Sequence, residues 1–320
     1  MRYDKAVEGF LLAFRADGNS QCTVDIYRYA HQRFSSRFGE KELEDITDQD
    51  LQGFWTWIRT DYKPKRANRK PGPLSGRSLE NIWTAMRSFW RWAEEEFSLA
   101  KRPDLRIKRP RYTPREVQPF CEEEIRKLIA ACGKAQPAHQ AARKGFAMER
   151  TTALRDAAIF LTLLDTGLRA GELCRLRIED LNLEQGELHI QPFGTGRKTK
   201  SRTVYLGNSS KKAIWRYLSH RETDSSDPLF STDDDRDLDV NGLKCICERL
   251  EKRSGVPNVH AHRLRHTFAV EYLKNGGDVF SLQRLGGWSD LDMVKVYMQL
   301  AQTDVRLAHR KASPADRWRL

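Results

Sequence analysis

The sequence predicts a mainly α-helical fold of two domains, with one small antiparallel sheet in the second domain. Three observations lead to this prediction. The 320 residues exceed what one hydrophobic core comfortably organises. Apolar residues recur at helical spacing through the first hundred positions, and a basic stretch broken by prolines follows them. We therefore expect a helical N-terminal domain over residues 1–100, a basic linker over 101–117 and a C-terminal domain over 118–320.

The first domain is predicted to contain amphipathic helices with aromatic inner faces. One stripe at steps of three and four consists of Val24, Tyr27, His31, Phe34 and Phe38. Another follows a cap at Thr47 or Asp48 and consists of Leu51, Phe54, Trp55 and Ile58. A third consists of Leu79, Ile82, Trp83, Met86, Phe89, Trp90, Ala93 and Phe97. Aromatic residues at this spacing usually form a core, so we expect them inside the domain and not stacked on bases.

The charge of the chain favours a polyanionic partner. Its 56 Lys and Arg against 44 Asp and Glu give a net charge of +12, which suits nucleic acid, although some soluble proteins are simply basic. Residues 63–73 form a basic, proline-broken segment that predicts a loop, and residues 100–119 hold seven Lys or Arg against two acids. The residues expected to contact DNA in these two segments are Lys65, Arg66, Arg69, Arg109 and Arg111.

The second domain is predicted to consist of helices and one short strand pair. A nearly all-apolar helix covers Ala157–Leu164, and Gly167 is placed to end it. The strands Leu188–Ile190 and Thr203–Leu206 flank a glycine turn at 194–196.

The cysteines and the hydropathy pattern indicate a soluble cytoplasmic protein. The six cysteines form no CxxC pair and have no histidine partner at zinc-finger spacing, so we expect buried thiols in a reducing compartment. Cys245 and Cys247 lie two apart in a helical stretch and should point away from each other. No apolar run approaches the roughly 18 residues of a membrane span, and the N-terminus lacks a signal-peptide core.

Two segments of the second domain place arginine among apolar residues. In Thr166–Leu173, Arg169 starts a helix, where it can cap carbonyl groups or pair with Glu172. The hairpin segment 197–202 carries Lys198, Lys200 and Arg202. Taken alone, it is a charged hairpin with no assigned role. In a DNA-binding protein, we expect it to face DNA.

Two further segments carry histidine, tryptophan and tyrosine. His262, Arg265 and His266 stand one helical turn apart on one face, which suits a single oxygen-rich ligand. Zinc is the competing interpretation, but Arg263 stands where an HExxH motif needs Glu, and two neighbouring arginines would repel a cation. We therefore expect no metal. Downstream of Trp288, Tyr297 lies on an amphipathic helix, where tyrosine is normally a core residue.

Taken in order, these segments resemble the catalytic domain of the tyrosine recombinase, or phage integrase, family, in its Xer- or Cre-like two-domain form. The shared pattern is TGLRAGEL, then KTKSRTV on a hairpin, HRLRHTFA, GGWSD, and Tyr297 nine residues after Trp288. The resemblance covers nearly the whole chain. It implies that the first domain is the family's helical, SAM-like core-binding domain and that the second is its mainly helical catalytic domain.

The resemblance also implies roles for individual residues. Arg169 and Arg265 match the arginines that hold the scissile phosphate, and Glu172 matches the acid supporting the first of them. His262 matches the histidine beside the phosphate, with His266 as a supporting partner. The remaining matches are Lys198 as the lysine that protonates the leaving oxygen, Trp288 in a position usually held by histidine, and Tyr297 as the nucleophile. The hairpin departs from the commoner GKGxKxR form, so Lys200 remains an alternative to Lys198.

This assignment agrees with the chemistry of phosphodiester cleavage. Two planar guanidiniums hold the nonbridging oxygens by forked hydrogen bonds, and tyrosine needs cations or a base to attack at neutral pH. The bond energy stays in the phosphotyrosine, so neither ATP nor another cofactor is expected. We find no carboxylate cluster of the two-metal nuclease type.

The function implied is site-specific recombination by cleavage and rejoining of DNA through a 3′-phosphotyrosine, as a homotetramer on two duplexes, in the cytoplasm and associated with the nucleoid. The segment from Asp304 to Leu320 is expected to dock on a neighbour. No separate arm-binding domain is apparent, which favours a simple recombinase or a mobile-element transposase. A type IB topoisomerase and a catalytically silent DNA-binding regulator are the alternatives.

Overall fold

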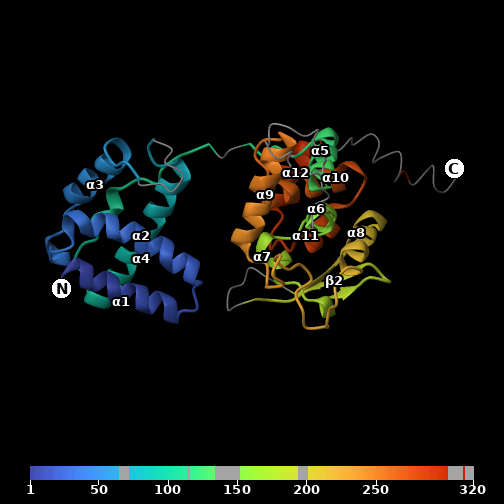
Figure 1. The fold of residues 1–320 in the computed structure, drawn as a ribbon. Helices are drawn as coiled ribbons and strands as arrows, with labels where there is room; N and C mark the ends of the chain where they lie inside the picture. The colour runs from blue at the N-terminus through green and yellow to red at the C-terminus, as the bar shows by residue number, and fades with distance from the viewer. Residues whose placement is uncertain (65–71, 114–115, 134–151, 194–200, 302–312, 314–320) are drawn as a thin grey trace, which may run out of the picture. The chain divides into compact units, whose positions relative to one another are not determined.

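The computed structural model describes residues 1–64, 72–113, 116–133, 152–193, 201–301 and 313. The chain divides into two compact units, one built from Met1–Glu116 and the other from most of the chain from Val117 on. Helices dominate both units, and three short strands form one sheet (Figure 1). The predicted mainly helical fold with a small antiparallel sheet is confirmed.

The first unit consists of helices whose starts are fixed by polar caps. Its elements are α1 (Tyr3–Ala16), α2 (Gln21–Phe38), η1 (Leu43–Asp45), α3 (Asp48–Thr60), α4 (Gly76–Phe97) and η2 (Pro103–Arg106). Of the two candidate caps of α3, Thr47 is the one used: its hydroxyl accepts from the Asp50 N–H, and the Asp50 carboxylate accepts from the Thr47 N–H. Such reciprocal caps satisfy N–H groups that have no partner within the helix.

The predicted aromatic stripes form the core of the first unit. Phe34, Phe54 and Phe89 are completely buried, and the Tyr3 ring packs between them at a centroid distance of 4.7 Å from Phe34 and 5.0 Å from Phe89. Trp90 is also completely buried. The prediction that these rings form a core and do not offer themselves to bases is confirmed for these residues.

Part of the predicted linker packs on the first unit. Pro103 and Asp104 are buried in η2, which contacts α3 and α4, and the Trp83 indole N–H donates to the Ile107 carbonyl at 3.1 Å. Pro103, Asp104 and Ile107 are therefore held against the first unit, whereas Leu105 and Arg106 are exposed. The domain boundaries themselves remain predictions.

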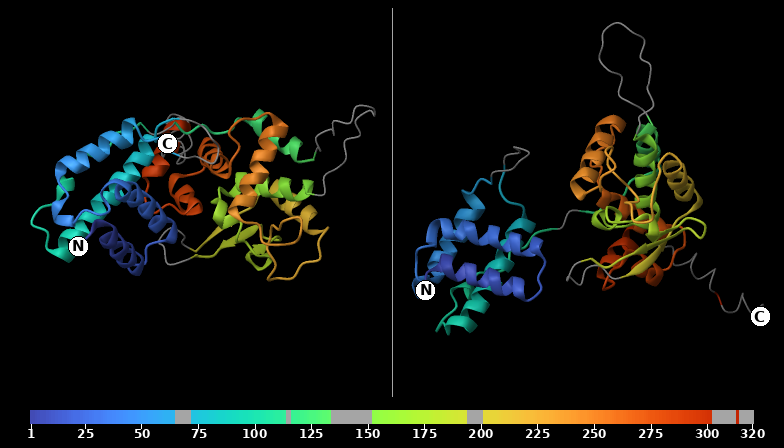
Figure 2. Two further views of the ribbon diagram at one scale, coloured as in Figure 1. Left: turned by 60° about the vertical axis from the view of Figure 1, so that its left-hand side comes forward. Right: turned by 60° about the horizontal axis from the view of Figure 1, so that its bottom comes forward.

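The second unit surrounds its small sheet with helices. The helices are α5 (Glu122–Gly133), α6 (Ala153–Thr166), α7 (Ala170–Leu173), η3 (Ile178–Asp180), α8 (Asn208–Leu218), α9 (Val240–Ser254), α10 (Ala261–Lys274), α11 (Val279–Gly286) and α12 (Asp292–Ala301). The strands are β1 (Leu181–Asn182), β2 (Glu187–Ile190) and β3 (Arg202–Tyr205), antiparallel in the order β1-β2-β3. Leu188 pairs with Val204, so the predicted strand pair is confirmed and extended by β1. Figure 2 shows these elements from two further sides.

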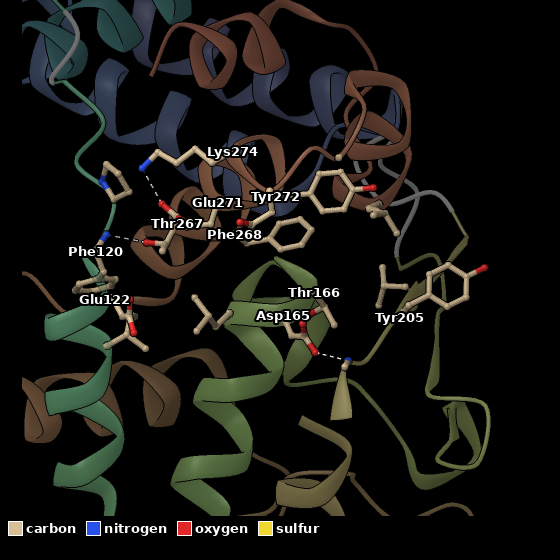
Figure 3. Close-up of a pocket in the computed structure, with 18 of the residues that line it drawn as sticks. Phe120, Glu122, Asp165, Thr166, Tyr205, Thr267, Phe268, Glu271, Tyr272 and Lys274 are labelled. Carbon is tan, nitrogen blue, oxygen red and sulfur yellow. Dashed lines mark hydrogen bonds and ion pairs between the residues drawn. The ribbon is translucent and has the colours of Figure 1, made fainter. Parts of the chain in front are cut away.

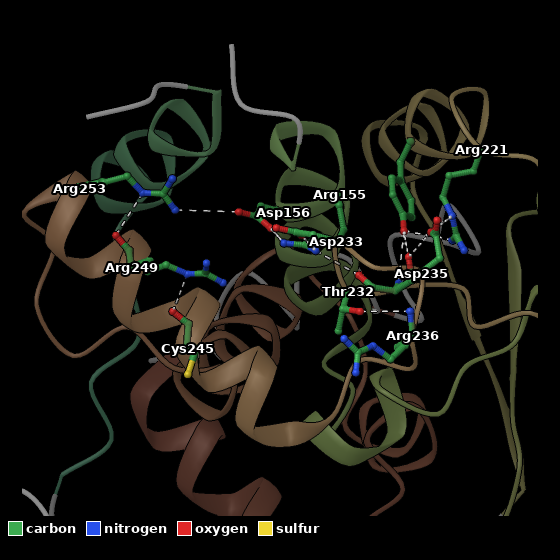
Figure 4. A network of polar contacts seen from close by, with 12 residues as sticks. Arg155, Asp156, Arg221, Thr232, Asp233, Asp235, Arg236, Cys245, Arg249 and Arg253 are labelled. Atoms are coloured by element: carbon green, nitrogen blue, oxygen red, sulfur yellow. Dashed lines mark hydrogen bonds and ion pairs between the residues drawn. The ribbon is translucent and has the colours of Figure 1, made fainter. Parts of the chain in front are cut away.

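Two apolar clusters and one polar network hold the second unit together. The larger cluster gathers residues of α5, α6, α9 and the sheet, and the smaller one joins α10, α11 and α12. Between α6 and the loop after α8, buried Arg155 donates to Asp156 at 3.0 Å and to Asp233 at 2.5 Å (Figure 4). Arg253 of α9 lies 3.9 Å from the second oxygen of Asp156. This network connects α6, α9 and the loop after α8. Its residues do not belong to the motifs shared with the recombinase family.

The expectation of six buried thiols is wrong for half of them. Cys132, Cys174 and Cys247 are buried, whereas Cys22, Cys121 and Cys245 are exposed. Cys22 and Cys245 lie on the exposed faces of helices α2 and α9. The expected divergence of Cys245 and Cys247 on their helix is confirmed. Within the described ranges, no helix is both long and apolar enough to cross a bilayer.

Candidate active site

Helix α10 carries the histidines and the second arginine of the predicted site. It begins at His260, whose Nδ1 accepts from the Arg263 N–H at 3.1 Å. Leu264 and Phe268 bury one side of the helix, while His262 and His266 lie on another face with their ring centroids 4.1 Å apart. The predicted alignment of the two histidines on one face is confirmed by this contact.

Arg265 is buried and held by backbone carbonyls. Its guanidinium donates to the carbonyls of Gly167 and Gly286, each at 2.6 Å, and lies 4.3 Å from the centre of the Trp288 ring. Only 2% of the residue is exposed. Burial, together with the positive charge of Arg169, lowers the pKa of Arg265 to about 10, which leaves it charged at neutral pH.

Arg169 stands at the start of α7, directly after the turn that ends α6. Gly167 makes this turn with a left-handed φ of 62°. The Arg169 guanidinium donates to Glu172 at 2.9 Å and to the Gly287 carbonyl at 3.0 Å, and 35% of its side chain stays exposed. The two ordinary roles considered from the sequence, capping a carbonyl and pairing with Glu172, are thus both present.

Arg202 lies in a different environment from the DNA-facing one that we expected. From β3 it donates to both oxygens of Glu172, at 3.0 and 2.7 Å, and to the Leu285 carbonyl at 2.8 Å. Its side chain is only 8% exposed. The guanidinium is part of the interior, because the side chain is almost fully covered and three of its N–H groups are bonded within the protein.

Glu172 is the acid shared by the two arginines. Burial by itself would raise the pKa of this carboxyl, but the hydrogen bonds and charges of Arg202 and Arg169 lower it to about 2. The Arg169 backbone N–H adds a third donor at 2.9 Å. Glu172 is therefore a permanent anion at neutral pH, enclosed by cations.

Tyr297 of α12 is buried against the histidines of α10. Its hydroxyl lies 2.8 Å from Nδ1 of His266, and its ring centroid lies 5.5 Å from that of Trp288. Burial raises the pKa of Tyr297, and the charge of Arg265 opposes this effect. Burial and the neighbouring His262 lower the pKa of His266 to about 4, so this imidazole is neutral at pH 7 and able to accept a hydrogen bond from the Tyr297 hydroxyl.

The structure thus brings seven of the predicted site residues into two adjoining contact groups. Arg169, Glu172 and Arg265 meet around the end of α11, and His262, His266, Trp288 and Tyr297 meet between α10 and α12. Trp288 joins the two groups through its contact with Arg265. The described residues include no group of three or more His, Cys, Asp or Glu suited to a metal ion.

The other predicted residues are separate from this site or fall outside the described ranges. Arg111 is exposed, and Arg109 is 67% exposed while paired with Glu80. The predictions that lie outside the described residues concern Lys65, Arg66, Arg69, Lys198 and Lys200.

The strand alternation in β3 is a sequence signal for the inward position of Arg202. Val204 is 1% exposed in β3, and residues two apart on a strand share a face. Arg202 lies two residues before Val204, so its side chain should also point to the interior, where a buried arginine needs a charged partner. The contact between His266 and Tyr297 had no comparable signal, because it joins helices from different parts of the chain.

A groove of about 1230 Å³ lies beside α10 in the same unit (Figure 3). Phe120, Leu164 and Phe268 supply apolar walls, and Asp165 and Glu271 are among its acidic residues. The described residues that line it do not include Arg169, Arg265 or Tyr297. The groove is therefore distinct from the candidate site, although Phe268 and Thr267 belong to the same helix.

Comparison with known proteins identifies close counterparts over nearly the whole chain. The tyrosine recombinase XerC of Oceanobacillus iheyensis is 30% identical over 92% of this chain and 91% of its own length. The tyrosine recombinase XerA of Saccharolobus solfataricus is 27% identical over 97% of this chain and 92% of its own.

Solved structures share the fold. A lambda integrase dimer bound to a COC′ core site has a TM-score of 0.68 at 17% identity, covering 92% of this chain and 97% of that one. XerH bound to a palindromic difH substrate has a TM-score of 0.64 at 20% identity, covering 92% and 80%. Residues 120–304, which hold every catalytic residue predicted above, match the phage integrase family. The chain therefore belongs to the phage integrase family, the tyrosine recombinases.

Proposed function

We propose that this protein is a site-specific DNA recombinase that cleaves and rejoins strands through a 3′-phosphotyrosine at Tyr297. The observation that carries the proposal is the convergence of Arg169, Arg265 and Tyr297 in a family member whose net charge is +12. Lambda integrase and XerH, which share this fold, have been solved bound to DNA, which supports DNA as the partner. An acid supplied by the hairpin and the arginine pair together provide what phosphodiester exchange needs.

In the proposed reaction, Tyr297 Oη attacks the phosphorus and the bond to the 5′ oxygen breaks. Neutral His266, 2.8 Å from the hydroxyl, orients it by accepting its hydrogen bond, and the phenolic proton passes to water as the bond to phosphorus forms. Lys198 gives a proton to the departing oxygen. Arg169 and Arg265 stabilise the charge that gathers on the nonbridging oxygens, with His262 beside them. Trp288 supports Arg265 by packing against it and donates from its indole nitrogen to the phosphate. Rejoining reverses these steps with the 5′ hydroxyl of another strand.

Access to Tyr297 requires a rearrangement when DNA binds. The residue is 0% exposed, so a phosphate cannot reach its hydroxyl while α12 keeps this position. In this arrangement Tyr297 is not positioned to attack a phosphate.

Substitution of Tyr297 by Phe tests the proposal. The change removes one oxygen from a packed ring and leaves the arginines in place, so DNA affinity should stay within about twofold while covalent linkage disappears. Both proteins are incubated with a nicked suicide substrate and separated in detergent. A detergent-resistant adduct with the Phe variant would refute the role of Tyr297.

The same assay, together with a test for relaxation of supercoiled DNA, separates the alternatives. A wild-type protein that binds DNA but never forms an adduct is a silent regulator. One that relaxes supercoils at unrelated sequences acts as a type IB topoisomerase.

We also propose that the protein works as a homotetramer on two duplexes. The groove beside α10 combines apolar walls with the acidic residues Glu122, Asp165 and Glu271, the last of them paired with Lys274. The C-terminal sequence from Asp304 to Leu320 holds five Lys or Arg against two Asp, together with Trp318 and Leu320, and so complements the groove in charge and hydrophobicity. Docking of this segment from one subunit in the groove of the next would close a ring. The mass of the DNA complex, measured with and without these residues, reports the assembly.

A further inference from the structure

Three consecutive carbonyl groups at the end of α11 each accept a hydrogen bond from a different arginine. The Leu285 carbonyl accepts from Arg202 at 2.8 Å, the Gly286 carbonyl from Arg265 at 2.6 Å, and the Gly287 carbonyl from Arg169 at 3.0 Å. The last carbonyls of a helix have no partner within it and carry partial negative charge. They therefore attract cations, and here they gather guanidiniums from β3, α10 and the start of α7.

Glu172 joins two of these arginines by a second route. Both its oxygens accept from Arg202, and one of them also accepts from Arg169 at 2.9 Å. The carboxylate is only 1% exposed. Three cations thus surround one formal anion and one helix end, and the cluster keeps an excess of positive charge.

The three arginines differ in what they have left to offer a phosphate. Arg169 keeps 35% of its side chain exposed. Arg202 is 8% exposed, and three of its five N–H groups are used by Glu172 and the Leu285 carbonyl. Its contacts therefore hold other groups of the site in place.

We propose that Arg202 is a positioning residue for the reaction: it fixes Glu172 and the end of α11, and through them sets the guanidiniums of Arg169 and Arg265 for the phosphate. This inference rests on the proposed function. Of its two acceptors, Glu172 is shared with Arg169, and the Leu285 carbonyl directly precedes the Gly286 carbonyl that Arg265 uses. This connection to the phosphate site distinguishes Arg202 from the buried Arg155–Asp156 pair elsewhere in the unit. A guanidinium misplaced by about 1 Å is enough to lower a rate about 10²-fold.

Loss of Arg202 should change the behaviour of Glu172. The groups that face this carboxylate are Arg202 from β3, Arg169 from the start of α7 and, at longer range, Arg265 from α10. Without Arg202, burial still raises the pKa of Glu172 while the main opposing interaction is gone. Glu172 then takes up a proton at a higher pH than in the wild type, and its hold on Arg169 weakens as the pH falls.

The test compares Arg202→Met with Arg177→Met in the full-length protein. Arg177 makes a similar two-bond pair with Asp237, at 3.0 and 2.9 Å, but this pair is exposed and lies outside the site. Single-turnover cleavage of a nicked suicide substrate is measured between pH 5 and pH 9, together with the DNA dissociation constant. We expect R202M to cleave about 10- to 100-fold more slowly with its dissociation constant changed less than about twofold, and R177M to match the wild type.

The pH profile separates positioning from a general loss of structure. The ratio of the wild-type rate to the R202M rate should grow as the pH falls, because Glu172 takes up a proton in this pH range only in the variant. His262 and His266 are present in both proteins, so the effect of their titration on the rate cancels in the ratio. An Arg202→Lys variant keeps the charge but cannot reach both acceptors, so it should lie between the two in rate. If R202M does not fold, R202K is compared with the wild type in its place. Slower cleavage by R202K at an unchanged DNA dissociation constant supports the inference.

Two results would overturn the inference. One is cleavage by R202M, or by R202K in its place, at the wild-type rate and pH profile. The other is a loss of DNA affinity as large as the loss of rate, which would make Arg202 a DNA contact or a purely structural residue. A wild-type protein that forms no covalent adduct would instead refute the proposed function, whatever the variants do.

Discussion

Replacing Glu172 by Gln should destabilise the protein in a way that depends on pH. The carboxylate is 1% exposed and accepts hydrogen bonds from the side chains of Arg202 and Arg169. Glutamine has nearly the same shape, carries no charge and imitates the protonated carboxyl. The substitution therefore removes the charge of the anion with little change in volume.

The size of the effect follows from the pKa of Glu172. Burial raises this pKa, yet Arg202 and Arg169 lower it to about 2, against an ordinary value of 4.5. At about 1.4 kcal/mol per pKa unit, the difference amounts to about 3 kcal/mol of folding free energy. A carboxyl whose pKa is lowered by folding contributes this stability above its unfolded pKa and loses it as the pH falls from about 4.5 towards 2.

Urea unfolding of the wild type and E172Q at several pH values tests this expectation. The variant should be less stable by about 3 kcal/mol at pH 7 and by about 1.5 kcal/mol near pH 3, since other carboxyls titrate equally in both proteins. As a control, Asp237→Asn in the exposed pair with Arg177 should cost less than about 1 kcal/mol. A stability difference that stays constant from pH 7 to pH 3, or that is already small at pH 7, would refute the reasoning.

Three other predictions concern the turn after α6, the hairpin and the DNA contacts. Gly167→Ala should cost about 2–3 kcal/mol in urea unfolding, because its φ is +62° and a Cβ would lie 2.2 Å from the Phe268 ring; a cost below about 0.5 kcal/mol would contradict this. Lys198→Ala should slow cleavage by roughly 10²- to 10⁴-fold, and a bridging sulfur at the 5′ position, which leaves without a proton, should restore most of the rate. Lys200→Ala should lose only binding, and sulfur rescue of this variant alone would move the acid to Lys200. Finally, the logarithm of the binding constant should fall with that of salt by about 0.9 per phosphate contacted, whereas a flat dependence would argue against basic DNA contacts.

Much of the fold was accessible from local patterns. The stripes containing Phe34, Phe54 and Phe89 predicted helices and a core because helical spacing alone decides which side chains share a face. The strand pair around Leu188 and Val204 was predicted for a similar reason, since its glycine turn and apolar residues are local. The strand β1 was missed because two residues carry too little pattern to be recognised.

The site was only partly accessible. Arg169, His262 and Tyr297 stand in motifs whose order along the chain is informative, so the resemblance located them. Arg202 was assigned to the surface because a lysine- and arginine-rich hairpin looks solvent-facing, and the buried acid that attracts it lies thirty residues away in sequence. Contacts that join distant segments, such as the one between His266 and Tyr297, follow from tertiary packing, which a single sequence does not display.

The anchor at the end of α11 is made of backbone oxygens, and this affects how the site will respond to mutagenesis. An alanine in place of Leu285 keeps the carbonyl that Arg202 uses, so its cost should reflect only the lost packing of the side chain against the two apolar clusters. Gly286 and Gly287 should be sensitive, since a Cβ at Gly286 would lie 1.9 Å from the Trp288 ring and Gly287 has a φ of +62°. Such variants will look like packing defects, although their loss of function comes from displacement of the carbonyl oxygens that accept from Arg265 and Arg169. Conservation of side chains would likewise not reveal the role of these carbonyl groups, because the backbone of every amino acid supplies the same oxygen.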